Sequence, residues 1–296
     1  MEFLNLLADF RLPAFNVFFQ AVTVFAQETI VILIICWIYW CQNKKLAYIL
    51  GFTYFISGLL VQGLKITFRI PRPWILDPDF SPVASALPAA TGYSFPSGHT
   101  QSGTALFSTL CFATRRKAGK LICILMIAAV SFSRLYLGVH TPKDVLVSLL
   151  LTLTVSAAVW KFLPPLLTRP GRNTGIVLFM TVFSGIMLVY AFLLCRMSTL
   201  PLSEASDCFK ACGAGLGFAA GFYLETTKIR FPAPATLVRK IWRFLPGIAG
   251  ALILQQGLKP LLGSSIPAGT IRYFIVVFWI IALYPLLFSR KQKAEL

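Results

Sequence analysis

The residues of this chain that could perform chemistry are concentrated between positions 65 and 144. The whole sequence has two histidines, His99 and His140, and both lie in this interval. The same interval contains Lys65, Arg72, Arg134 and Asp144. A neutral imidazole can attack an electrophile or transfer a proton near neutral pH, and clustered Lys and Arg bind anions. This combination suits chemistry on a phosphate group, which requires positioning and charge stabilisation.

The first segment with such residues contains Lys65 and Arg72, which are seven positions apart. A continuous helix would place both on one face, but Pro71 and Pro73 flank Arg72 and disrupt the helix. Arg72 is therefore expected to turn inward from the exit loop. The alternative for each cation is a side chain that extends from a helix end to the membrane surface, which is our interpretation of Arg69.

The second segment, Pro96-Ser97-Gly98-His99, has the pattern of a helix start with Ser97 as the N-cap. The backbone amides of Gly98 and His99 would then point at a bound anion, aided by the helix dipole. A plain helix cap is the alternative, and the two interpretations are compatible.

The third segment places Asp144 four residues, or one helical turn, after His140. At this spacing the carboxylate can accept the N–H of one ring nitrogen and so fix the tautomer of the histidine, as the carboxylate of a catalytic triad does.

Written as patterns, the three segments are K-x6-R-P, P-S-G-H and S-R-x5-H-x3-D. Together they resemble the signature of the type 2 phosphatidate phosphatase superfamily, with every fixed position present, over about residues 29–163. The resemblance implies that His140 is the nucleophile and becomes phosphorylated, and that His99 protonates the leaving oxygen and then deprotonates the attacking water. It also implies a set of phosphate-binding residues, which are Lys65, Arg72, Ser97, Gly98 and Arg134.

Composition places the chain among integral membrane proteins, because 57% of its residues are hydrophobic and 12% are charged. The net charge of +17 does not indicate nucleic-acid binding, because the Lys and Arg residues form short clusters between apolar runs rather than a basic face. Glu2 and Asp9 stand where a secretory signal would be basic, so we expect the N-terminus to remain in the mature protein.

The predicted fold is an all-α bundle of about nine transmembrane helices, because the chain has nine apolar runs near the length that spans a bilayer. The runs are 17–41, 46–66, 97–114, 119–138, 143–163, 174–195, 208–224, 241–259 and 268–289. The first contains Glu28 and could be two shorter pieces, while residues 2–11 are expected to form an interfacial helix. We divide the chain into a phosphatase core, 1–163, and additional C-terminal helices, 164–296.

Loop charges predict the orientation in the membrane. One set of alternate loops carries 17 Lys and Arg residues, including Arg169 and Arg172, and the other carries 10, of which Lys65, Arg72 and Arg134 belong to the motifs. The richer set is expected to be cytoplasmic, with the N-terminus outside and the C-terminus inside. An even number of crossings then separates the three motifs, so they would share the non-cytoplasmic face.

Three further regions remain open to interpretation. The long loop 74–95 is either a cap over the site or a partly mobile surface loop. The helices after residue 163 are interpreted as helices that only pack in the bundle, and the alternatives are that they form a lipid groove or a dimer surface. Cys195, Cys208 and Cys212 lie near a polar loop, but no paired framework indicates a disulfide, including one between Cys195 and Cys208.

The predicted function is hydrolysis of a lipid phosphate or diphosphate, of the polyprenyl diphosphate or phosphatidate type, with sphingoid phosphates next. The alternative is a soluble sugar phosphate, because the nine spans and the stretch from Arg72 to Asp77 also resemble glucose 6-phosphatase. A non-catalytic transporter is a remote alternative, because Glu28 is the only ionisable residue well inside a predicted span and no motif position is missing.

The predicted partners are the bilayer and a membrane lipid substrate, with no nucleic acid and no cofactor. Metal dependence is not expected, since the site has one carboxylate at a fixed motif position, with Asp77 and Asp79 on the neighbouring loop. The expected location is the plasma or inner membrane, and the oligomeric state is unknown from the sequence.

Overall fold

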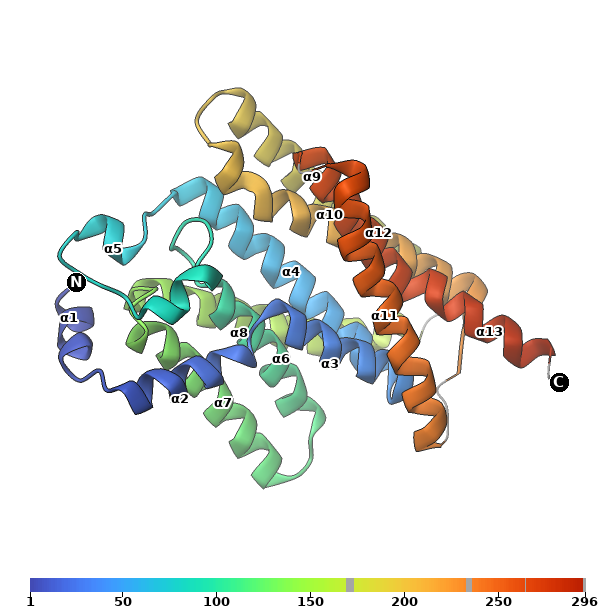
Figure 1. Ribbon diagram of the computed structural model, residues 1–296. Helices are drawn as coiled ribbons and strands as arrows, with labels where there is room; N and C mark the ends of the chain where they lie inside the picture. Colours follow the sequence, from blue (N-terminus) through green and yellow to red (C-terminus); the bar gives the residue numbers. More distant parts are fainter. Residues whose placement is uncertain (169–172, 233–235, 264, 295–296) are drawn as a thin grey trace. The chain divides into compact units, whose positions relative to one another are not determined.

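The protein is all-helical in its computed structural model (Figure 1), which describes residues 1–168, 173–232, 236–263 and 265–294. Over these ranges every regular element is a helix and no strand occurs. The predicted all-α class is therefore confirmed. Arg169 and Arg172, which contribute to the predicted cytoplasmic set, lie outside the described residues.

The chain forms two compact units, one made of residues 1–32 and 52–161 and the other of residues 33–51 and 162–296. The predicted division at residues 163 and 164 follows the motifs and apolar runs rather than compactness, and it stays a prediction.

The first unit contains all three motifs. Its elements are α1 (Glu2–Asp9), α2 (Pro13–Val24), the start of α3 (Glu28–Cys41), most of α4 (Lys44–Phe68), α5 (Pro73–Leu76), η1 (Ala84–Ala89), α6 (Gly98–Ala113), α7 (Lys117–Tyr136) and α8 (Pro142–Leu167), of which the last residues belong to the other unit. Helix α6 packs along α7, to which a short connection joins it, and α1 and α2 also pack on α7 (Figure 1). The run 17–41 is indeed two helices, since α2 ends before Glu28 and α3 begins there.

The second unit contains the start of α4 and most of α3, followed by the C-terminal helices. These are α9 (Asn173–Arg196), α10 (Leu202–Leu224), η2 (Glu225–Ile229), α11 (Leu237–Leu262), α12 (Ile266–Phe278), η3 (Trp279–Leu283) and α13 (Tyr284–Ala294). Helix α10 approaches α12 closely at Gly213 and Gly217, where an added Cβ would collide with the backbone carbonyls of Thr270 and Phe274. Small residues at such a contact let two membrane helices pack backbone to backbone.

The chain is an integral membrane protein, because several helices are long and apolar enough to cross a bilayer. Within the described residues five pass this test, or six if α2 and α3 form one broken span. The five are Lys44–Leu76, Lys117–Tyr136, Pro142–Leu167, Asn173–Arg196 and Ile266–Ser289. Large apolar side chains on α9, such as Leu178 and Ile186, are exposed, as expected for residues that face lipid.

The predicted count of nine spans is not confirmed, although every predicted run corresponds to one helix or to consecutive helices. Helix α6 has 16 residues, many of them Ser, Thr or Gly, and α10 and α11 contain charged residues such as Lys210 and Arg243. The orientation of the termini also stays a prediction. All seven cysteines are free, including Cys195, Cys208 and Cys212.

Candidate active site

Four helix ends meet in the first unit and bring the three motifs together. They are the end of α4, the start of α6, the end of α7 and the start of α8. The first of these, the end of α4, is sharply defined. Helix α4 stops at Phe68, and Arg69 adopts a left-handed conformation with φ of 51°. The two prolines after it keep the chain out of a helix until α5, so Arg72 lies outside α4 and is only 5% exposed. The predicted inward turn of Arg72 is therefore confirmed.

The start of α6 has the predicted cap. Ser97 Oγ accepts the backbone N–H of Thr100 at 3.4 Å and the hydroxyl of Thr100 at 3.1 Å. Gly98 is the first helical residue, and a Cβ added there would meet nothing within 4 Å. The first amides of a helix have no intrahelical acceptor, so this end can receive an anion.

The connection from α7 to α8 carries His140, and its conformation is determined at both of its ends. Gly138 has φ of +73°, which favours glycine, and it directs the chain away from α7. At the start of α8, Asp144 Oδ2 accepts the backbone N–H of Thr141 at 2.8 Å, which is the reciprocal half of a capping box. The backbone carbonyl of Asp144 also accepts the N–H of Ser97 at 3.1 Å, so α8 is tied to the start of α6.

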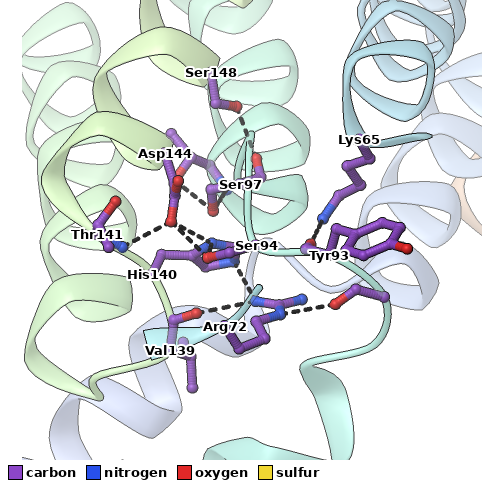
Figure 2. Close-up of polar contacts among 12 residues, drawn as sticks. Lys65, Arg72, Tyr93, Ser94, Ser97, Val139, His140, Thr141, Asp144 and Ser148 are labelled. Carbon is purple, nitrogen blue, oxygen red and sulfur yellow. Dashed lines mark hydrogen bonds and ion pairs between the residues drawn. The ribbon is translucent and has the colours of Figure 1, made fainter. Parts of the chain in front are cut away.

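His140 is held between a cation and a carboxylate (Figure 2). Arg72 Nη1 lies 3.0 Å from His140 Nε2, and Asp144 Oδ2 lies 3.6 Å from Nδ1. A guanidinium only donates hydrogen bonds, so Nε2 must be the accepting nitrogen and the neutral ring carries its proton on Nδ1. This is the tautomer predicted for a carboxylate at position 144, and it leaves a lone pair on Nε2.

Ser94, which the sequence motifs do not include, lies between the ring and the carboxylate. Its hydroxyl donates to Asp144 Oδ2 at 2.6 Å, and its Oγ is 3.5 Å from His140 Nδ1. Its own N–H donates to the carbonyl of Ile70 at 2.8 Å, which ties this residue to the loop that carries Arg72. The position three residues before Ser97 gave no signal for this role.

Backbone carbonyls of residues 91–93 hold two of the predicted phosphate-binding cations. Arg72 donates to Thr91 O at 2.6 Å and to Gly92 O at 2.9 Å. Lys65 Nζ donates to Tyr93 O at 2.5 Å (Figure 2). These carbonyls belong to the loop 74–95, whose 3-10 helix η1 packs through Ala86 against the α7–α8 connection. The loop is thus part of the site, and its role as a cap stays a prediction.

Arg134, the third predicted cation, is fully buried near the end of α7. Its Nη1 donates to Thr23 Oγ1 of α2 at 2.8 Å, while Nε and Nη2 have no hydrogen-bond partner among the described residues. Buried guanidinium donors without acceptors are costly, which indicates that an anion completes the arrangement. Sequence reasoning did not identify Thr23, because it lies 111 positions away from Arg134.

His99 is the second residue of α6, and its Nε2 is buried without a hydrogen-bond partner among the described residues. Burial lowers the pKa of His99 well below its usual value, and the charges of Arg134, Arg72 and Lys65 lower it further. An imidazole nitrogen without a protein partner is available to a ligand or a reacting group.

Burial lowers the pKa of His140 well below its usual value, and the nearby charges of Arg72, Arg134 and Lys65 lower it further. The ring is therefore neutral at neutral pH, which is the form with a nucleophilic nitrogen.

Comparisons with known proteins agree with this geometry. The family model of the PAP2 superfamily matches residues 46–167, and the model described as PAP2 superfamily phosphatase, transmembrane extension, matches residues 209–295. The two matches together cover more than two thirds of the chain. The chain belongs to the PAP2 superfamily. The resemblance drawn from the three motifs is thereby confirmed, and the first match contains all of them.

Three curated relatives resemble this PAP2 chain. The undecaprenyl-diphosphatase BcrC of Bacillus subtilis is 29% identical over 133 residues, which are 44% of this chain and 65% of that protein. The sphingosine-1-phosphate phosphatase 2 of Mus musculus is 24% identical over 79% of this chain and 70% of its own length, and a probable sphingosine-1-phosphate phosphatase of Dictyostelium discoideum is 24% identical over 73% and 55%. The chain thus spans about two thirds or less of the first and third relatives. No solved structure matches at a significant level.

Proposed function

We propose that this chain is a membrane phosphatase that hydrolyses a lipid phosphate or diphosphate through a phosphohistidine on His140. The contact between Arg72 Nη1 and His140 Nε2, at 3.0 Å, carries the proposal. A phosphate group that binds Arg72 is brought directly to the nitrogen that has the lone pair, which is the positioning that phosphoryl transfer requires.

A substrate phosphate can replace backbone acceptors that two of the cations contact in the structure. Arg72 and Lys65 rest on neutral backbone carbonyls, and a phosphate dianion is a stronger acceptor for both. Arg134 offers two buried donors, and the start of α6 offers the amides of Gly98 and His99. Together these groups suit the equatorial oxygens of a phosphoryl group in its transition state.

The reaction proceeds in two balanced steps. The Nε2 lone pair of His140 attacks phosphorus, and an N–P bond forms as the P–O bond to the leaving group breaks. His99, protonated once the negative charge of the bound phosphate offsets the surrounding cations, gives its proton to the leaving oxygen. In the second step neutral His99 takes a proton from water, the water oxygen attacks phosphorus, and the N–P bond breaks to release phosphate. Asp144 stabilises the positive charge that develops on the His140 ring in the first step.

The proposed chemistry uses no metal and no cofactor. Among the described residues no group of three or more His, Cys, Asp or Glu side chains could hold a metal ion. Lys65, Arg72 and Arg134 would supply the positive charge that a two-metal phosphatase takes from its ions. A chelator should leave turnover unchanged, whereas vanadate, which forms a five-coordinate oxyanion, should inhibit. Inhibition by chelator that magnesium reverses would contradict this part of the proposal.

A lipid substrate is supported by the location of the site at helix ends, where a headgroup reaches the cations while its tails stay in the bilayer. The names of the relatives include a polyprenyl diphosphate and a sphingoid phosphate as substrates of those proteins. We expect polyprenyl diphosphate or phosphatidate to be the preferred substrate class, ahead of sphingoid phosphates.

The test is phosphate release by the purified protein, without added metal. The panel contains undecaprenyl diphosphate, phosphatidate, sphingosine 1-phosphate and glucose 6-phosphate, with His140→Ala as the catalytic control. We expect turnover of a lipid and its loss in His140→Ala. A preference for glucose 6-phosphate over every lipid would overturn the substrate class, and retention of more than a few per cent of the rate in His140→Ala would overturn the nucleophile.

The site is proposed to face the non-cytoplasmic side of the plasma or inner membrane, as the loop charges indicate. Asp79, on the exposed part of loop 74–95, is a suitable reporter, and Lys117, the exposed first residue of α7, is the matched control for the opposite face. A membrane-impermeant thiol reagent should label Asp79→Cys in intact cells and Lys117→Cys only after the cells are opened. The reverse pattern would invert the topology.

A further inference from the structure

The nucleophilic histidine and its carboxylate are not in direct hydrogen-bond contact. His140 Nδ1 and Asp144 Oδ2 are 3.6 Å apart, beyond the usual range for an N–H···O bond. Asp144 Oδ1 has no hydrogen-bond partner among the described residues, whereas Oδ2 accepts from Ser94 and Thr141. Something besides Asp144 must therefore help to hold the ring.

Ser94 occupies the position between them, and it is 0% exposed. A carboxylate only accepts hydrogen bonds, so the 2.6 Å contact with Asp144 Oδ2 must use the single proton of the Ser94 hydroxyl. Its oxygen lone pairs then face His140 Nδ1 at 3.5 Å. The N–H on Nδ1 consequently has two acceptors at nearly the same distance, Ser94 Oγ and Asp144 Oδ2.

The two acceptors of the Nδ1 proton become more important when substrate binds. In the structure Arg72 donates to His140 Nε2 and so helps to keep the proton on Nδ1. A phosphate group that engages Arg72 removes this help at the moment when Nε2 must have its lone pair. From then on only the Nδ1 side can hold the tautomer, and a ring with its proton on Nε2 cannot attack phosphorus.

We propose that Ser94 is a positioning residue that relays between His140 Nδ1–H and Asp144 and keeps the nucleophilic tautomer while phosphate occupies the site. This role rests on the proposed function, because it concerns the same nucleophile. Ser94 is also tied through its N–H to Ile70 in the loop before Arg72, so its backbone position does not depend on the hydroxyl. Ser94→Ala therefore removes the relay and leaves the backbone contact.

The kinetic test compares Ser94→Ala, Ser94→Thr and the control Ser85→Ala, which makes the same change at an exposed position of the same loop. We expect kcat of Ser94→Ala to fall about 10- to 100-fold, the range for losing a hydrogen bond to a charged group. KM should change little, because Lys65, Arg72 and Arg134 remain. Ser94→Thr, which keeps the hydroxyl, should recover part of the rate, and Ser85→Ala should match the parent protein. A parent-like kcat in Ser94→Ala would overturn the proposal.

The second measurement does not depend on turnover. Because the sequence has two histidines, 15N labelling of histidine gives two ring spectra, and His99→Gln leaves that of His140 alone. With inorganic phosphate present, the parent should show the proton on Nδ1, and Ser94→Ala should show a substantial population with the proton on Nε2. Unchanged tautomer populations in Ser94→Ala would overturn the proposal even if kcat falls. If the parent protein hydrolyses no phosphate ester, the proposed function fails, while this spectrum still decides the role of Ser94.

Discussion

Each of the two units contains a buried cluster of charged side chains, and the clusters differ in how completely their polar atoms are paired. In the second unit Glu225 is 1% exposed, and both of its carboxylate oxygens are engaged, one by Lys44 Nζ at 2.5 Å and the other by the Tyr48 hydroxyl. Lys44 also donates to Phe231 O at 2.9 Å and lies over the Phe231 ring.

In the first unit the corresponding groups are incompletely paired. Arg134 Nε and Nη2, His99 Nε2 and Asp144 Oδ1 are buried and have no hydrogen-bond partner among the described residues. A buried polar group without a partner destabilises the folded state, so such groups persist where a ligand completes them. The comparison predicts that substitutions in the Glu225 cluster change stability, whereas substitutions in the first-unit cluster change activity.

The largest effect in this comparison is expected from His99→Ala. Turnover of an alkyl phosphate should fall by about 100- to 10,000-fold, because its leaving oxygen needs a proton. An aryl phosphate, whose leaving oxygen needs less help, should retain much more activity. The measurement is kcat on both esters with the same protein preparation, and an equal loss on both would contradict the role of His99 as the acid.

Arg134→Met should lower kcat/KM by about 100- to 1,000-fold, as expected for the loss of an oxyanion donor. Its melting temperature should stay the same or rise, because the substitution removes buried donors that have no acceptor among the described residues. Thermal unfolding in detergent, with and without inorganic phosphate, measures this directly. A lower melting temperature together with unchanged activity would place Arg134 among structural residues.

Thr23→Val should have a smaller effect, of about 10-fold on kcat/KM, because Arg134 keeps its charge but loses the hydroxyl that holds Nη1. Valine has nearly the shape of threonine, so the packing of α2 on α7 is preserved. A parent-like kcat/KM would show that Thr23 does not position the guanidinium.

The smallest effect on activity is expected from Glu225→Gln, which should leave kcat of the folded protein unchanged. Stability should fall by about 2 kcal/mol, because the substitution breaks a largely buried ion pair with Lys44. Asp207→Asn is the control, since it breaks the more exposed pair with Lys210 and should cost about 0.5 kcal/mol or less. An activity loss in Glu225→Gln that exceeds its loss of folded protein would remove the distinction between the clusters.

Local sequence patterns predicted the helices and the local backbone features beside the motifs. Hydrophobic runs identified every long helix, Ser97 was recognisable as an N-cap, and the prolines beside Arg72 indicated its inward turn. These features depend on neighbours within one or two helical turns, and such information is present in the sequence.

Contacts between distant segments were not predictable in the same way. Ser94 and Asp144 are 50 positions apart, and the carbonyls that hold Arg72 are contributed by backbone, which leaves no trace in residue type. The number of spans could not be determined from the sequence either, because helices such as α6 are short or polar for a bilayer crossing. The role of a loop residue that acts through its main chain can be recognised only in the three-dimensional structure.

The backbone carbonyls of residues 91–93 have a consequence for protein engineering. Every amino acid carries the same carbonyl, so the contacts to Arg72 and Lys65 do not depend on which side chains occupy positions 91 and 93. Gly92, with φ of 62°, is the one position of the three where the backbone conformation favours glycine. Saturation libraries at positions 91 and 93 could therefore select for altered substrate preference while the catalytic cations keep their anchors.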